Sequence, residues 1–112
     1  NKLQKQIKVQ VSTINHELEK VEKHKIKLVK IDVEGWEKFV IKGGESFFKI
    51  YSPIVMVEFT DENTYNAGYS AHEIYEIMVQ YGYEWYIFKG GKLIKESKRL
   101  FYPYNNLIAI KP

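Results

Sequence analysis

The sequence predicts an α/β fold in which buried strands alternate with amphipathic helices, and three features carry this prediction. Two short runs, residues 28–33 and 54–59, are almost continuously apolar, as in strands covered on both faces of a parallel sheet. Apolar residues that follow each run recur at helical spacing. A glycine pair between two strand-like segments, residues 90–91, predicts an antiparallel hairpin near the carboxyl terminus.

The amino-terminal part predicts a strand, a short helix and a second strand. Apolar and polar residues alternate over Ile7–Val11, which is the period of a half-exposed strand. Asn15 is then expected to be the N-cap of a short polar helix that turns Leu18 and Val21 inward. The apolar strand Leu28–Val33 follows.

Two helical segments are predicted between the buried strands. Trp36, Phe39 and Val40 fall at positions i, i+3 and i+4 on one helical face, and Gly43 predicts a left-handed helix end. A second helical turn is expected to end before Pro53, because the residue that precedes a proline is biased away from helix. Its inward-facing residues are expected to be Phe47, Phe48 and Ile50.

The second apolar strand, Ile54–Phe59, predicts the start of another strand–helix unit. Residues 61–69 are polar and contain a glycine, so we interpret them as a loop over the carboxyl edge of the sheet. Ser70 and Glu73 form the pattern of a capping box for the next helix, and Gly82 is expected to end that helix. The buried stripe of this helix is predicted to comprise Ile74, Ile77, Met78 and Tyr81.

The carboxyl-terminal part predicts a hairpin and a final strand. Residues 83–88 are strand-like, and Gly90 and Gly91 suit a tight turn because both central positions tolerate a positive φ. Residues 93–95 return along the hairpin, and residues 106–110 make the last strand. At 112 residues, the chain has room for one core, so we predict a single domain, 1–112.

Composition excludes several classes of protein. Apolar residues make up 45% and aromatic residues 15% of the chain, which is typical of a globular protein. Without cysteine there is no disulfide framework and no thiol nucleophile. The sequence shows no signal peptide and no apolar run of about 18 residues, so we expect a cytoplasmic protein that does not span a membrane.

The charge pattern does not favour nucleic-acid binding. The net charge is +3, and lysines gather over residues 20–30 and 92–99. Glutamates are interspersed with the first cluster, as on a solvated helix face. A nucleic-acid surface would need a basic stripe with exposed aromatic residues, whereas the aromatic residues here mostly alternate into strands. We therefore expect no nucleic-acid partner.

Carboxylates stand where the two buried strands end. Asp32 and Glu34 share a strand parity, so both side chains should leave the same face. At the carboxyl end of a strand, where ligands of open α/β sheets bind, such a pair could act as a general base or bind a divalent metal. The alternative is that both are solvated turn residues, with Glu34 favoured by the dipole of the next helix.

Two further residues belong to the same end of the sheet. Gly35 is best explained sterically, since a side chain there would crowd the turn or a ligand. Glu58 ends the second strand, either as an exposed carboxylate or as a buried one that needs a partner. The three histidines lack metal-ligand spacing, and we predict no metal site.

These segments resemble the FkbM-type S-adenosylmethionine-dependent methyltransferases. Residues 30–37, K-I-D-V-E-G-W-E, are similar to the central K-I-D-x-E-G-x-E motif of that family. Residues 52–58 are similar to its P-x-I-x-x-E strand, and residues 73–88 and 105–110 resemble its later helix and strands. Residues 7–15 resemble the lead-in V-x-V-x-T-L-D, with isoleucine and asparagine in place of its last two residues.

The resemblance implies a Rossmann-like class I methyltransferase sheet, of which this chain is the carboxyl-terminal half. Parallel strands would be followed by an antiparallel hairpin, and the last strand would enter antiparallel between its neighbours. Asp32 and Glu34 would be the catalytic carboxylates, which take the hydroxyl proton or orient the acceptor. Gly35 and Glu58 would line the substrate or cofactor pocket.

The resemblance also implies a reaction, namely methyl transfer from S-adenosylmethionine to a hydroxyl of a sugar or natural product. The family's glycine-rich cofactor loop is absent from residues 1–112, so we expect an incomplete catalytic domain that is inactive alone. Its expected partners are the small-molecule or sugar acceptor and either a second copy, as a homodimer, or the missing amino-terminal half. The alternative is a non-catalytic binding or assembly module derived from the same half-fold.

Overall fold

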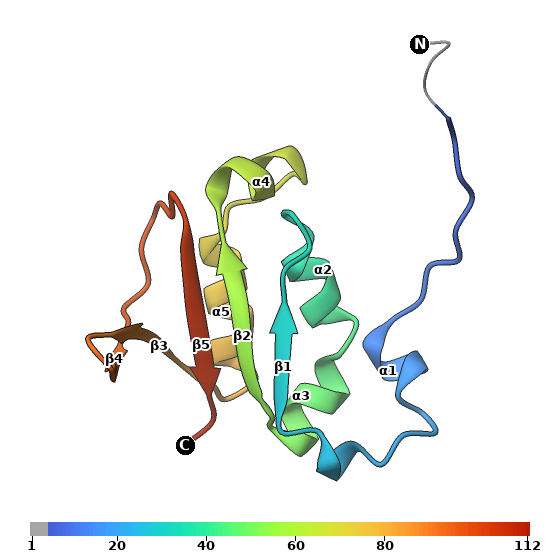
Figure 1. The fold of residues 1–112 in the computed structure, drawn as a ribbon, viewed down its shortest axis with the longest axis horizontal. Coiled ribbons are helices and arrows are strands. Elements are labelled where there is room, and N and C mark those ends of the chain that lie inside the picture. The colour runs from blue at the N-terminus through green and yellow to red at the C-terminus, as the bar shows by residue number, and fades with distance from the viewer. Residues whose placement is uncertain (1–4) are drawn as a thin grey trace.

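The computed structural model describes residues 5–112, which form a five-stranded mixed sheet with its main helices packed on one face (Figure 1). The strands lie in the order β1-β2-β5-β3-β4. The elements are α1 (Ile14–Glu17), the 3-10 turn η1 (Lys23–Lys25), β1 (Leu28–Ile31), α2 (Glu37–Lys42), α3 (Glu45–Tyr51), β2 (Ile54–Phe59), α4 (Asp61–Asn66), α5 (His72–Gln80), β3 (Glu84–Lys89), β4 (Lys92–Lys95) and β5 (Asn105–Ile110).

The sheet combines a parallel pair with an antiparallel insertion. β1 and β2 run parallel, in a register that pairs Leu28 with Ile54 and Ile31 with Val57. β5 lies between β2 and β3 and is antiparallel to both, which confirms the predicted placement of the last strand. Gly90 and Gly91, with φ of 59° and 75°, form the turn of the β3–β4 hairpin, as predicted.

The core lies between one face of the sheet and helices α2, α3 and α5. Alternate residues of a strand face opposite sides, and Val55, Val57 and Phe59 of β2 are each 0% exposed on the helix side. The residues that meet them from the helices and neighbouring strands are Ile41, Phe48, Ile74, Met78, Trp85, Leu107 and Ala109. This packing fixes β1 and β2 rigidly, and with them whatever stands at their carboxyl ends.

The opposite face of the sheet carries apolar residues that remain accessible. Leu28 of β1 is 61% exposed, Ile54 of β2 42%, and Phe88 of β3 67%. β1 is also an edge strand, since within residues 5–112 only β2 pairs with it. Unpaired strand edges promote association with another chain. The homodimer, or pairing with an amino-terminal half, stays a prediction.

The predicted strand over residues 7–11 is wrong. This segment is extended but unpaired, and it runs away from the sheet (Figure 1). Ile7, Val9 and Val11 are 82%, 76% and 93% exposed. Alternation of apolar and polar residues gives a strand only where a neighbour supplies its hydrogen bonds, and no described segment does so here.

Two predicted helix boundaries near the amino terminus are also wrong. Thr13, not Asn15, caps α1, because its hydroxyl accepts from the His16 N–H. Asn15 instead lies within the helix, and its Oδ1 accepts from the Phe47 N–H at 3.3 Å. Val21 is 43% exposed rather than turned inward. Leu18 does pack against the core.

The α2–α3 connection differs from the expected left-handed stop. Gly43 has a φ of −71°, and the left-handed residue is Ser52, after α3. An added Cβ at Gly43 would lie 3.2 Å from the Cβ of Thr13, a tight contact that requires Thr13 to shift by a few tenths of an ångström. Phe47 and Phe48 are buried as predicted, but Ile50 is 70% exposed.

Residues 61–66 form helix α4, not the predicted loop, although the segment does lie over the carboxyl ends of β1 and β2 (Figure 1). β1 ends at Ile31, two residues before the predicted end at Val33. Half of the capping box is present, since the Ser70 N–H donates to Glu73 Oε2 at 3.1 Å. None of the described helices is long and apolar enough to cross a membrane.

Candidate functional site

Two carboxylates face each other where the parallel strands β1 and β2 end. The register pairs Ile31 with Val57, so the next residues, Asp32 and Glu58, stand opposite one another. Val57 and Phe59 on either side of Glu58 are buried against the helices, so Glu58 projects from the other face of the sheet. Asp32 follows the buried Ile31 and is exposed. The structure thus brings together one residue predicted as catalytic and one predicted to line the pocket.

Glu58 is the more enclosed member of the pair, with 8% of its surface exposed. Burial is the largest cause that raises the pKa of Glu58, followed by the adjacent Asp32 carboxyl, with a smaller effect from Glu34. The Thr60 hydroxyl donates to Glu58 Oε1 at 3.2 Å and opposes part of this rise. Glu58 therefore holds a proton more firmly than an isolated carboxylate would.

Glu34 does not share the strand parity of Asp32, because β1 has already ended. Its φ of 53° places it in a left-handed turn. Its Oε2 accepts a hydrogen bond from Asn63 Nδ2 of α4 at 3.2 Å. The parity argument is therefore wrong, yet Glu34 remains close enough to contribute to the raised pKa of Glu58.

Gly35 follows at a φ of 102°, and helix α4 explains why no side chain fits there. An added Cβ would lie 2.3 Å from the Asn63 carbonyl oxygen, well inside van der Waals contact. A side chain at Gly35 would therefore be crowded, as predicted, and the group that it would meet is the backbone of α4. A role of Gly35 in a ligand pocket stays a prediction.

Glu37 was not predicted as a site residue, although it closes the K-I-D-V-E-G-W-E segment. It is 1% exposed at the start of α2. Its Oε2 accepts from the Val33 N–H at 2.9 Å, and its Oε1 accepts from the Gly35 N–H at 3.0 Å. One feature of the sequence could have identified Glu37: a glutamate here lies within hydrogen-bonding reach of the preceding tight turn.

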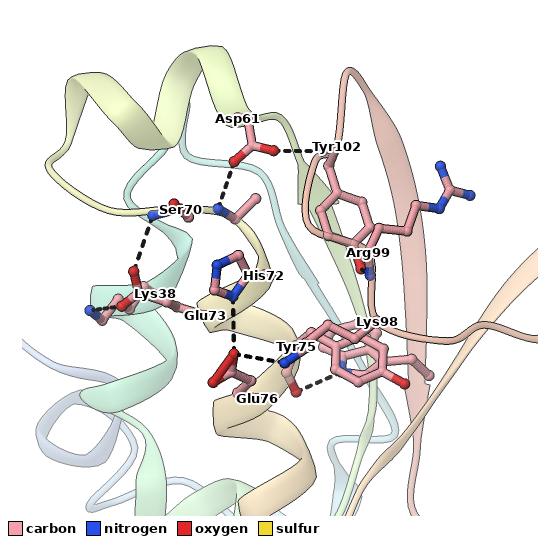
Figure 2. A network of polar contacts seen from close by, with 12 residues as sticks. Lys38, Asp61, Ser70, His72, Glu73, Tyr75, Glu76, Lys98, Arg99 and Tyr102 are labelled. Carbon is pink, nitrogen blue, oxygen red and sulfur yellow. Dashed lines mark hydrogen bonds and ion pairs between the residues drawn. The ribbon is translucent and has the colours of Figure 1, made fainter.

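Tyr69 supports the same turn from the segment after α4. Its hydroxyl donates to the Gly35 carbonyl at 2.8 Å and accepts from the Lys38 N–H at 3.2 Å. Burial raises the pKa of Tyr69 well above its usual range, so the hydroxyl keeps its proton and continues to donate. Lys38 in turn pairs with Glu73 of α5 at 2.8 Å (Figure 2).

Asp61 joins α4 to two other parts of the fold, as Figure 2 shows. Its carboxylate is 0% exposed and accepts from the backbone N–H groups of Ala71 and Tyr102. The Asp61 N–H also donates to the Tyr102 carbonyl at 2.8 Å. This residue, which sequence reasoning assigned to a loop, holds α4 above the carboxylates.

Outward from Tyr102, polar contacts attach residues 96–99 to α5. The Tyr75 hydroxyl donates to the Glu96 carbonyl at 2.9 Å, and Lys98 Nζ lies 3.3 Å from Glu76 Oε1 (Figure 2). His72, one turn earlier on α5, lies 3.0 Å from the same oxygen and is the first cause of the lowered pKa of Glu76. These partly exposed contacts fix the segment that leads into β5.

Two mainly apolar cavities lie away from the carboxylates. One of about 330 Å³ is bounded by α1, β1 and α3, and one of about 580 Å³ lies between the amino-terminal segment and α2. Neither lining includes Asp32, Glu34 or Glu58. Among residues 5–112, no group of three or more histidine, cysteine, aspartate or glutamate side chains is arranged to hold a metal ion.

Glu58→Gln is expected to stabilise the fold at neutral pH. The folded chain holds the Glu58 proton more tightly than the unfolded chain, in which the carboxyl has its ordinary pKa of 4.5. The contribution to stability is therefore complete below 4.5 and is lost as pH rises through the raised folded pKa. Urea unfolding at several pH values should show the advantage of the variant growing across that interval. A difference that is the same at every pH would contradict the raised pKa.

Comparison with known proteins identifies a family for this chain. A family model described as the methyltransferase FkbM domain matches residues 2–85. That span includes Asp32, Glu34, Gly35 and Glu58, together with the helix that covers them. No curated protein and no solved structure matches the chain.

Proposed function

The chain belongs to the methyltransferase FkbM domain family. We propose that it carries the proton-accepting carboxylates of an S-adenosylmethionine-dependent methyltransferase. The acceptor class that we propose is a hydroxyl group of a sugar or natural product, which the enzyme converts to a methyl ether. The observation that carries the proposal is the Asp32–Glu58 pair at the carboxyl ends of two adjacent parallel strands. In open α/β sheets, ligands bind at this edge.

The two carboxylates suit proton transfer from a hydroxyl. Asp32 is exposed and can take the proton of an acceptor hydroxyl. Glu58, whose pKa is raised, lies beside Asp32 and can share that proton. Glu34, held by Asn63, offers a second carboxylate that can orient the acceptor.

When bound, S-adenosylmethionine would supply an electrophilic methyl group. The described residues fit the acceptor side of this reaction but not a cradle for the donor. Gly43 and Gly44 lie between two helices, and Gly90 and Gly91 form a hairpin turn, so neither pair opens a helix after a buried strand.

We further propose that residues 1–112 form the carboxyl-terminal half of a Rossmann-like sheet, as one domain whose cofactor loop lies outside these residues. The parallel β1–β2 pair and the antiparallel insertion of β5 support this arrangement. The edge of β1 that no strand within residues 5–112 pairs with, and the apolar residues on the accessible face, are consistent with further strands and helices there.

Asp32→Asn should lower the turnover of the protein that the gene encodes, including any residues before Asn1, by about 10²–10⁴-fold, because it removes the proton acceptor. The assay measures S-adenosylhomocysteine released in the presence of a panel of sugars and hydroxylated small molecules. Circular dichroism should show an unchanged fold.

Glu62→Gln is the matched control, because Glu62 is an exposed carboxylate of α4 that contacts none of the site residues through a hydrogen bond. Full activity of Asp32→Asn would overturn the role of Asp32 and leave it a turn residue. A wild-type protein that neither binds S-adenosylmethionine nor transfers methyl groups would instead identify a non-catalytic binding or assembly module.

A further inference from the structure

We propose that Glu37 is a positioning residue, which holds the turn that presents Glu34 to the Asp32–Glu58 pair. The inference rests on the proposed function of that pair. Glu37 does not face the acceptor itself, since it is 1% exposed beneath the turn. It acts through the backbone on either side of Glu34.

The geometry of the contact is that of a clamp. The Val33 N–H and the Gly35 N–H flank Glu34, and they donate to the two different oxygens of the Glu37 carboxylate at 2.9 and 3.0 Å. A carboxylate that accepts two backbone N–H groups fixes both the position and the rotation of the intervening peptide units. The single residue between these donors, Glu34, is thereby held in one orientation.

The turn needs such support because its backbone is unfavourable. Glu34 has a φ of 53°, in the left-handed region that a residue with a Cβ rarely occupies. A flexible turn would relax to another conformation and swing the Glu34 side chain elsewhere. Tyr69 holds the Gly35 carbonyl, and Asn63 holds the Glu34 carboxylate. Among residues 5–112, only Glu37 accepts from the backbone on both sides of Glu34.

The position of Glu34 matters because its negative charge acts on the Glu58 carboxyl. Glu34 contributes to the raised pKa of Glu58, together with burial and Asp32. If the clamp is released, Glu34 moves away from Glu58 and this contribution disappears. A purely structural role for Glu37, such as support for the start of α2, would lower stability without changing how Glu58 titrates.

The first test is a carboxyl titration by nuclear magnetic resonance on the 112-residue chain, with wild type, Glu37→Gln, Glu34→Gln and the control Glu62→Gln. A glutamine at 37 offers one acceptor oxygen for two donors, so one N–H loses its partner. Both Glu37→Gln and Glu34→Gln should lower the pKa of Glu58, and Glu62→Gln should leave it unchanged. A Glu58 titration that Glu37→Gln leaves unaltered would overturn the proposal.

Amide hydrogen exchange in the wild type covers the case in which Glu37→Gln fails to fold. The Val33 and Gly35 amides are expected to exchange much more slowly than those of the unpaired segment 7–11, because both are held by the carboxylate. Exchange at the same rate as in that segment would contradict the clamp, whatever the variant does.

The second test is a double-mutant cycle in the active protein. Loss of a residue that orients a functional side chain typically lowers activity by about 10–100-fold. We expect Glu37→Gln to lower kcat within that range and to add no further loss when combined with Glu34→Gln. Additive losses would mean that Glu37 does not act through Glu34. If the wild type transfers no methyl groups, the proposed function fails, whereas the titration and exchange still decide whether the clamp exists.

Discussion

Gly35→Ala is expected to lower the free energy of unfolding by about 3–5 kcal/mol, near the upper end of single-residue effects. An alanine Cβ would lie 2.3 Å from the Asn63 carbonyl oxygen, and a backbone atom of a helix cannot move aside as a side-chain tip can. The φ of 102° adds strain for any residue with a Cβ. Urea unfolding followed by circular dichroism measures the loss, against a total stability of about 5–15 kcal/mol for a domain of this kind.

Gly68→Ala provides a matched control. Gly68 has a similar φ of 95°, but an added Cβ there would meet nothing within 4 Å. The control therefore carries the conformational strain without the collision, and its loss should be about 1–2 kcal/mol. The difference between the two variants isolates the contact between the turn and α4. Equal losses would show that α4 does not press on Gly35.

Elements set by local sequence were predicted well. β2 is apolar at every position except Glu58, and the hairpin depends on two glycines at adjacent positive-φ positions, so each carries its own signal. Helix α4 has no apolar periodicity, and its buried residues are the polar Asp61 and Thr64. Its conformation depends on tertiary hydrogen bonds, which a periodic pattern does not reveal. The segment 7–11 is the opposite case: its sequence has the alternating pattern of a strand, but no described segment pairs with it.

The candidate site likewise contains residues that the sequence identifies and residues that it does not. Asp32 and Glu58 were found because strand ends can be located from sequence, and their register then brings them together. Tyr69 and Asp61 were missed because their partners lie far along the chain, whereas Glu37 bonds to amides only two and four residues away. Tyr69 bonds to a carbonyl 34 residues away, and Asp61 bonds to an amide 41 residues away. Such buried polar groups are recognised only once the fold is known.

Asp61→Ala is expected to destabilise the fold by about 2–6 kcal/mol, because two buried backbone donors would each lose an acceptor at about 1–3 kcal/mol. The donors are the N–H groups of Ala71 and Tyr102, and both residues are themselves 0% exposed. Water cannot reach these groups without opening the contact between α4, α5 and the segment before β5. Urea unfolding gives the total loss, and amide exchange at residues 71 and 102 should accelerate.

Glu62→Ala tests whether this loss belongs to the buried contact or to α4 itself. It removes a carboxylate from the next position of the same helix, where the side chain is exposed, and it should change stability by no more than about 0.5 kcal/mol. Asp61→Ala should also release α4 from its place above the site and so weaken the hydrogen bond from Asn63 to Glu34. The Glu58 pKa should then fall in Asp61→Ala but not in Glu62→Ala. If both variants unfold at the same urea concentration as the wild type, Asp61 does not anchor the helix.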